Sequence, residues 1–243
     1  MRRAGHEVPR SRTMDHDHLT LFRKSWTLYD AIAAENCMFH RELYGRIGDL
    51  FTKRHESGPF RLLDLGCGNA RFLAPCLEKS TPLRYDGVDL SPVALEEARD
   101  HLSGFEGVIF HEEDMVEHVN STEERYDLVF TGYAVHHLAP EQKARLFEGC
   151  AACVDPGGEI LMIDVLREEG QELGDYLASY LRLMREEWTA IPAEMIEEAC
   201  EHVAAHDQPA SFSELSSVAR SVGWTSAEIL ERHGPHHLLR FFR

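Results

Sequence analysis

Short apolar runs alternate with helical segments from residue 60 onward. The runs are "RLLDL", "RYDGVDL", "VIFHEED", "YDLVFT" and "GEILMIDV", at 61–65, 84–90, 108–114, 126–131 and 158–165. A helical stretch at 211–224 and two more strand-like runs at 226–232 and 236–242 follow later. Strands that alternate with helices form right-handed crossovers and a parallel sheet. The sequence therefore predicts an α/β fold that binds its ligand at the carboxyl ends of the strands.

Two helical regions lie outside this alternation. Residues 16–54 carry apolar side chains at helical spacing, and Phe22, Trp26 and Tyr29 gather on one helix face. Residues 168–206 form a long, charged, helical stretch. We expect an N-terminal tail and helical cap over 1–57 that closes over bound ligand, and an α/β domain over 58–243 with a helical insertion at 168–206.

The charge balance limits the classes of partner. The 243 residues include 42 acidic and 25 basic side chains, for a net charge of −17. This charge repels polyanions, so nucleic acid is disfavoured unless a local basic patch exists. No segment approaches the roughly 20 consecutive apolar residues of a membrane helix. We expect a cytoplasmic protein without a membrane partner, of which either Met1 or Met14 is the natural start.

Six cysteines are scattered through a chain that is too large to depend on disulfides. Cys150 and Cys153 form a CxxC pair, but no second pair lies nearby at the spacing of a zinc site. Their segment is typical of a helix that ends at the following Pro and Gly. We therefore expect the thiols of these cysteines to be reduced and structural.

The first strand runs into a glycine-rich turn, "DLGCGNARF". A phosphate-binding P-loop is excluded because its spacing and its lysine are absent. A dinucleotide fingerprint would need a glycine at Arg71 and is weakly supported. Asp64 and, after the second strand, Asp89 flank the turn. These acids oppose a pyrophosphate but suit a ligand with an ammonium or sulfonium charge.

Five ordered segments resemble the class I S-adenosylmethionine-dependent methyltransferases. They are "LLDLGCGNARF", with Ala70 at the third glycine, "YDGVDLSP", "EEDM", "RYDLVFTGYAVHHL" and "DPGGEILMID". The resemblance covers 60–166 closely and 209–243 by pattern. It implies a Rossmann-like, doubly wound, seven-stranded sheet that is mostly parallel, with an antiparallel last strand. It also implies S-adenosylmethionine as the cofactor.

The resemblance assigns cofactor roles to particular residues. Gly66, Cys67 and Gly68 would let the backbone approach the methionine part. Asp64 would face its ammonium, although a turn-capping aspartate would leave the same pattern. Asp89, beside Leu90, would accept hydrogen bonds from both ribose hydroxyls. Asp114 would accept a hydrogen bond from the adenine amine, with the Met115 backbone beside the ring. The neighbouring acids Glu112 and Glu113 leave this register uncertain by one residue. Thr131 and Gly132 would place their backbone near the methionine end and the methyl group.

The segment "TGYAVHHL" bears on the reaction subtype. It lacks the Asn or Asp followed by two prolines that amino-methyltransferases of DNA bases typically carry. Tyr133, His136 and His137 are the candidate catalytic residues, because histidine can act as a base and tyrosine can donate a hydrogen bond. A histidine that merely begins the next helix would give the same pattern. Adjacent histidines do not share a helix face, so no metal is expected.

A helical roof encloses a small molecule better than a polymer. Substrate contacts are expected from side chains of the cap and the insertion, namely Tyr29, Tyr176, Tyr180, Arg182 and Trp188. The expected acceptor is a small, polar, amino-acid-like molecule that is methylated on nitrogen or oxygen. The alternatives are a nucleic-acid base or protein side chain as acceptor, a nicotinamide-dependent reductase, and a non-catalytic cofactor-binding relative.

Overall fold

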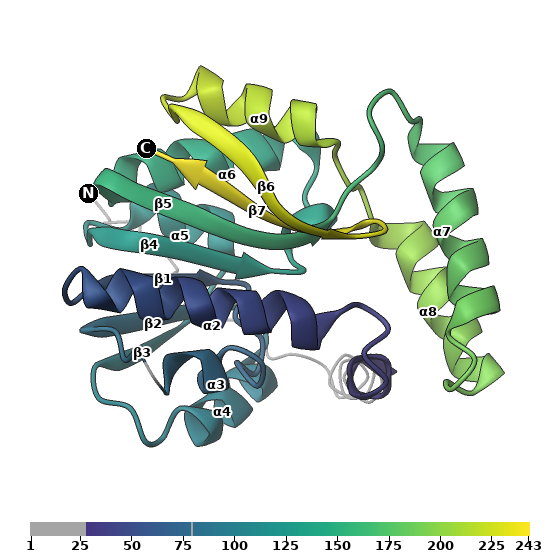
Figure 1. Cartoon of the computed structure of the whole chain (residues 1–243), viewed down its shortest axis with the longest axis horizontal. Coiled ribbons are helices and arrows are strands. Elements are labelled where there is room, and N and C mark those ends of the chain that lie inside the picture. Colours follow the sequence, from purple (N-terminus) through teal and green to yellow (C-terminus); the bar gives the residue numbers. More distant parts are fainter. Residues whose placement is uncertain (1–27, 79) are drawn as a thin grey trace, which may run out of the picture.

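Seven strands form one mixed sheet in the described part of the chain, in the order β3-β2-β1-β4-β5-β7-β6 (Figure 1). The computed structural model describes residues 28–78 and 80–243. The strands are β1 Arg61–Leu65, β2 Arg84–Asp89, β3 Val108–Glu112, β4 Tyr126–Gly132, β5 Val154–Val165, β6 Ser226–His233 and β7 His236–Phe242.

The pairing explains the direction of each strand. β1 pairs in parallel with β2 on one side and with β4 on the other, and β3 and β5 continue the parallel series outward. β7 is antiparallel to both of its neighbours, β5 and β6. The prediction of a mostly parallel seven-stranded sheet with an antiparallel last strand is therefore confirmed.

Helices cover both faces of the sheet. The helices of the described residues include α2 His40–Glu56, α3 Ala74–Leu77, α4 Pro92–His101, α5 Met115–Ser121, α6 Pro140–Cys153, α7 Leu173–Glu187, α8 Ala193–His206 and α9 Phe212–Ser221, of which α7 and α8 do not lie on a face of the sheet (Figure 1). Leu62 packs in the cluster that contains α2, whereas Leu63, the next residue along β1, packs in the cluster that contains α6 and α9. Side chains alternate across a strand, so β1 needs apolar residues at both positions.

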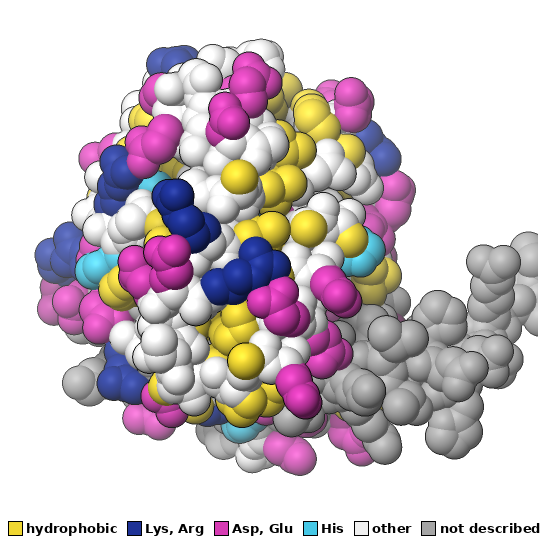
Figure 2. Space-filling model, turned by 90° about the vertical axis from the view of Figure 1, so that its right-hand side faces the viewer, with side chains coloured by type: hydrophobic (Ala, Val, Ile, Leu, Met, Phe, Trp, Pro, Cys, Tyr) yellow, Lys and Arg dark blue, Asp and Glu magenta, His cyan; other side chains and the backbone are white. Residues whose placement is uncertain are grey.

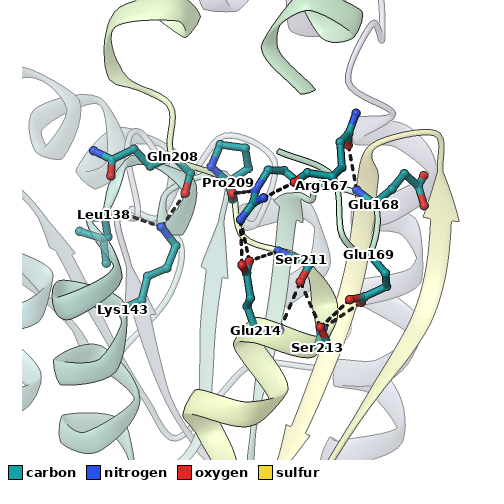
Figure 3. Close-up of polar contacts among 11 residues, drawn as sticks. Leu138, Lys143, Arg167, Glu168, Glu169, Gln208, Pro209, Ser211, Ser213 and Glu214 are labelled. Atoms are coloured by element: carbon teal, nitrogen blue, oxygen red, sulfur yellow. Dashed lines mark hydrogen bonds and ion pairs between the residues drawn. The ribbon is translucent and has the colours of Figure 1, made fainter. Parts of the chain in front are cut away.

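The helical insertion consists of α7 and α8, which lie beyond the carboxyl ends of the parallel strands (Figure 1). Hydrogen bonds tie its two ends together (Figure 3). Nη2 of Arg167, before α7, donates to both carboxylate oxygens of Glu214 of α9, at 2.9 and 2.8 Å. The Arg167 amide also donates to the carbonyl of Ala210 at 3.0 Å. The insertion is thus anchored at its base, next to the end of β5.

The predicted N-terminal cap is only partly described. Residues 28–34 are helical and α2 follows. Phe22 and Trp26 lie outside the described residues, so the predicted aromatic stripe is represented by Tyr29 alone. The predicted domain boundary after residue 57 falls between α2 and β1. Because α2 buries Leu43, Ile47 and Phe51 in the same cluster as the sheet, it packs as part of the core.

This packing predicts that truncating Ile47 destabilises the whole domain. The Ile47 side chain is fully buried, so Ile47→Ala should lower the free energy of unfolding by about 2–5 kcal/mol. Urea denaturation measures the loss. Lys53→Ala, on the exposed side of the same helix, is the control and should change stability by less than about 0.5 kcal/mol. Equal, small losses for both variants would contradict the packing of α2 on the sheet.

Candidate functional site

A cavity of about 950 Å³ opens at the carboxyl ends of the parallel strands. The loops after β1, β2, β3 and β4 line one part of it. Residues 28–34 and side chains of α7 and α8 line another. The cavity lies where an open α/β sheet is expected to bind its ligand.

The turn after β1 is shaped by left-handed backbone. Gly66 and Gly68 have φ values of 69° and 52°, and Ala70 adopts 56°. A Cβ atom added at Gly66 would lie 2.7 Å from the Cβ of Ala134. Gly66 is therefore required both by its dihedral angle and by the close approach of the loop after β4. Ala70 shows that the third glycine position here is left-handed too, and that it tolerates one methyl group.

Asp89, at the end of β2, holds this turn in place. One of its carboxylate oxygens accepts from the Gly68 amide at 2.8 Å, and the other accepts from the Ser91 amide at 2.8 Å. Burial raises the pKa of Asp89, and these amide hydrogen bonds oppose that rise. The Ser91 hydroxyl caps α4 by accepting from the Ala94 amide. Leu90, between them, exposes 63% of its surface and lines the cavity.

Asp64 lies deeper, at the carboxyl end of β1. It is 2% exposed and accepts a hydrogen bond from the Tyr85 hydroxyl at 2.6 Å. Burial raises the pKa of Asp64 to about 7, although the Tyr85 hydrogen bond lowers it. A cation beside this carboxylate would favour its ionised form.

The loop after β3 carries the acid that was expected to serve the adenine amine. The Asp114 carboxylate caps α5 by accepting from the amides of Val116 and Glu117, at 2.8 and 3.0 Å. Asp114, Met115 and Glu113 all line the cavity. The cap therefore uses part of the hydrogen-bonding capacity that was expected to serve the adenine amine.

The end of β4 differs in part from expectation. Gly132 lines the cavity, whereas the Thr131 side chain is 1% exposed and is not among the lining residues. Strand alternation turns the Thr131 side chain into the interior, which leaves only its backbone for the positioning role expected of it. Tyr133 lines the cavity with a left-handed φ of 54°. Its hydroxyl donates to the Met38 carbonyl, so as placed it anchors the segment before α2.

His136 and His137 lie on a 3-10 turn over Val135–His137, after β4. His136 is buried, with Nδ1 hydrogen bonded to Asp164 at the end of β5. Burial lowers the pKa of His136. The Asp164 carboxylate raises this pKa by more than burial lowers it, so the pKa lies above its usual value. The His137 side chain is 41% exposed, and its Nδ1 lies 3.3 Å from Asp207. Of this pair, His137 is the more accessible to a molecule in the cavity.

The predicted substrate residues divide into two groups. Tyr29, Tyr180 and Trp188 line the cavity. The Tyr29 hydroxyl lies 2.8 Å from Nε2 of His40. Tyr176 is buried outside the lining, behind Tyr180, with which its ring stacks at 5.5 Å. Arg182 is exposed and does not line the cavity. It lies on a different side of α7 from Tyr180, because residues two apart do not share a helix face.

Several lining residues had no strong sequence signal. They come mainly from the turn after β1, from α8 and from the segment after it, and include Asn69, Arg71, Glu198, Glu201, His202, His206 and Asp207. Arg71 also pairs with Asp30 at 2.8 Å and so links the glycine turn to residues 28–34. Asp164 was detectable in principle, because it lies near the end of a predicted strand.

Two further expectations concern the whole chain. Cys150 and Cys153 are free and buried in α6 and its C-terminal end, and all six cysteines are unpaired. Within residues 28–78 and 80–243, no helix has the length and apolar character needed to cross a membrane.

Comparison with known proteins shows similarity to methyltransferases. Residues 63–160 match the family model described as "Methyltransferase domain". The chain is 25% identical over 158 residues, 65% of its length, to malonyl-[acyl-carrier protein] O-methyltransferase 2 of Ilyobacter polytropus. It is 27% identical over 96 residues, 40% of its length, to phosphoethanolamine N-methyltransferase of Plasmodium falciparum. These matches span 57% and 36% of the two relatives.

A solved structure extends the similarity to nearly the whole chain. Human N-acetylserotonin methyltransferase, crystallised with S-adenosylmethionine, superposes with a TM-score of 0.61 at 18% identity. The match covers 95% of this chain and 60% of that one. At this identity the likeness concerns the fold. Residues 63–160 thus match a methyltransferase domain, and the chain as a whole has the fold of solved S-adenosylmethionine-dependent methyltransferases.

Proposed function

We propose that the protein transfers a methyl group from S-adenosylmethionine to an oxygen or nitrogen atom of a small acceptor. The observation that carries the proposal is one continuous cavity joining the glycine turn and its two acids to a second region walled by helices. Its volume of about 950 Å³ lies near the upper end of the range for small-molecule sites. This volume leaves room for a cofactor and an acceptor side by side.

The turn after β1 suits the cofactor rather than a dinucleotide. Asp64 and Asp89 line the same part of the cavity. Two carboxylates at this point favour an ammonium or sulfonium charge and oppose a pyrophosphate. In our proposal Asp64 faces the ammonium group and Asp89 accepts hydrogen bonds from the ribose hydroxyls. Leu90 contacts the cofactor near its adenine. The matched family supports this assignment against a nicotinamide-dependent reductase.

The acceptor region favours a molecule with an apolar body and one polar end. Its walls include Ile32 of the N-terminal segment, Met184 and Trp188 of the α7 region, and Val203 of α8. Polar side chains, including His137 and His202, line the same cavity. This lining modifies the expectation of a purely polar, amino-acid-like acceptor. The two curated relatives act on oxygen in one case and on nitrogen in the other, so either atom remains within the proposal.

Methyl transfer from a sulfonium requires mainly alignment of the acceptor atom behind the methyl carbon. Enforced proximity and orientation can contribute about 7–11 kcal/mol. His137 is the candidate for taking a proton from the acceptor, because its ring is accessible. In this scheme His136 and Tyr133 are positioning residues, since each is held by a partner, Asp164 and Met38 respectively.

A macromolecular acceptor is less well supported. Figure 2 shows basic and acidic side chains interspersed on the face that carries the insertion, with apolar atoms in a band between them. Such a face lacks the clustered positive charge that nucleic-acid binding uses.

Two measurements test the proposed function. S-adenosylhomocysteine should raise the melting temperature, and NAD(H) should not. Incubation with isotopically labelled S-adenosylmethionine and pools of small alcohols, carboxylic acids and amines should then transfer label to a product. Stabilisation by NAD(H) alone would exclude the proposal. Binding of S-adenosylhomocysteine with no transfer to any acceptor pool would instead support a non-catalytic relative.

Substitution of Asp89 tests the cofactor assignment. Asp89→Asn should weaken S-adenosylhomocysteine binding about 10- to 100-fold, because hydrogen bonds to a charged acceptor contribute roughly 1.5–3 kcal/mol. Isothermal titration calorimetry measures the dissociation constant. Asp100→Asn, an exposed position on α4, is the matched control and should bind normally. An unchanged dissociation constant for Asp89→Asn would show that this acid does not serve the cofactor.

The raised pKa of Asp64 predicts pH-dependent binding. In the free protein, burial raises this pKa to about 7, so the group is largely protonated below that pH. The ammonium group favours the carboxylate, so binding releases a proton and affinity is lost as the pH falls through 7. Affinity for S-adenosylhomocysteine should fall up to about tenfold per pH unit below 7 and level off above it.

Calorimetry in buffers of different ionisation enthalpy, from about pH 5.5 to 8.5, measures this proton release. Asp64→Asn is the control, because it removes the titrating group and should flatten the dependence. A wild-type profile that is as flat as that of Asp64→Asn would contradict the assignment of Asp64 to the ammonium.

A further inference from the structure

Three potential metal ligands meet in the wall of the cavity. They are His136 and His137 from the turn after β4 and Asp207 from the end of α8. Nε2 of His136 lies 3.8 Å from one Asp207 oxygen, and Nδ1 of His137 lies 3.3 Å from the other. Ligands around a tetrahedral zinc ion are roughly 3.3 Å apart, as follows from Zn–N and Zn–O bonds of about 2.0–2.2 Å. The spacing is thus close to that of a coordinated ion.

Asp207 is the unexplained member of this group. It is 6% exposed, and its Oδ1 atom is buried without a hydrogen-bond partner among the described residues. Asp207 follows directly after α8, whose C-terminal end carries a partial negative charge. A buried carboxylate at that end of a helix is unfavourable unless a cation or donors compensate it.

The nearby lysine is already engaged by other atoms. Lys143 Nζ donates to the carbonyl oxygens of Leu138 and Gln208, as Figure 3 shows. It therefore reduces the local negative charge without a hydrogen bond to Asp207. Glu198 and Glu201 of α8 line the same cavity and add further negative charge.

His136 is oriented as metal-binding histidines usually are. Its Nδ1 is bonded to the buried carboxylate of Asp164, which leaves Nε2 directed to the Asp207 side. A carboxylate behind the ring fixes the tautomer and raises the basicity of the ligating nitrogen. The adjacent histidines looked like a poor site by themselves, and Asp207 supplies the missing third donor.

A second group of possible ligands has a simpler explanation. His111, Glu113 and His118 also lie close together. There, however, His118 bonds Glu113 at 2.9 Å, and His111 bonds Asp86 at 2.9 Å. Each of those rings already has a carboxylate partner. The orphaned atom among the three is a ring nitrogen, Nε2 of His118, and not a charged carboxylate oxygen.

We propose that His136, His137 and Asp207 bind one divalent transition-metal ion of the zinc class. Two imidazoles and one carboxylate suit Zn²⁺, Co²⁺ or Fe²⁺ better than Mg²⁺ or Ca²⁺, which prefer oxygen ligands. The remaining coordination positions face the cavity, because all three residues line it. Such an ion would hold an oxygen or nitrogen atom of a molecule bound there. The site goes beyond the proposed methyl transfer and does not depend on it; with the ion bound, His137 is a ligand and no longer the base of that scheme.

Titration of the metal-free protein with Co²⁺ tests the site directly. One equivalent should bind, with visible ligand-field absorption typical of low coordination number, and Zn²⁺ should displace it. Both ions should also raise the melting temperature. Absence of the absorption, or binding no tighter than that of the His137→Ala variant, would overturn the proposal. Because S-adenosylhomocysteine binding is measured separately, failure of the metal site and failure of the proposed function are distinguishable.

Substitutions then assign the ligands. His137→Ala and Asp207→Asn should each weaken Co²⁺ binding at least 100-fold, and Asp164→Asn should weaken it about 10- to 100-fold through the orientation of His136. His55→Ala, on the exposed side of α2, is the control and should bind normally. Binding that survives both ligand substitutions would contradict the assignment.

The melting temperature without metal provides a second readout for Asp207. If the Asp207 carboxylate is uncompensated without a bound cation, metal-free Asp207→Asn should melt at or above the temperature of the metal-free wild type. The reason is that the variant no longer buries an uncompensated charge. Co²⁺ should then raise the melting temperature of the wild type only. A lower melting temperature for metal-free Asp207→Asn would show that the protein itself already satisfies the carboxylate.

Discussion

The carboxylate of Asp89 joins the two loops on which the cavity depends. It accepts from the amide of Gly68 in the turn after β1 and from the amide of Ser91 at the start of α4. These bonds hold a turn with repeated left-handed residues against the neighbouring strand. The turn can pass close to the loop after β4 only because Gly66 has no side chain. The Asp89 carboxylate therefore shapes the pocket and also lies at its edge, where it can accept a hydrogen bond from a ligand.

Buried charge organises the opposite side of the cavity. Asp164, His136, Lys143 and Asp207 are all buried near one another, where β4 and β5 end and the insertion returns to the sheet. Burying charge is unfavourable unless partners compensate it, so such a group is sensitive to what binds beside it. The ion pair of Arg167 with Glu214 anchors the base of the insertion nearby (Figure 3). The acceptor region is thus formed where the inserted helices meet the sheet.

Local patterns were sufficient to predict much of the fold and the position of the glycine turn at the carboxyl end of β1. The run "RLLDL" coincides with β1, and "HHLLRFF" coincides with β7. The glycine turn and Asp89 lie at strand ends, where a short segment of sequence determines both position and chemistry. On the acceptor side, local patterns did not show which side chains line the cavity. Tyr133 was expected to serve catalysis, but its hydroxyl bonds to Met38, and Arg182 was expected at the substrate but is exposed away from it.

The sequence by itself determined the order of strands and helices, and the acid-flanked turn at the end of the first strand. These features depend on periodicity and on residues close together in the chain. Only the tertiary structure decided which side chains of the insertion face the cavity, and that Asp207 meets His136 and His137 there. That meeting depends on how α8 packs against the sheet and on where the chain returns after it. Long-range packing of this kind leaves no mark in the local spacing of residues, which is why the third donor was not predicted.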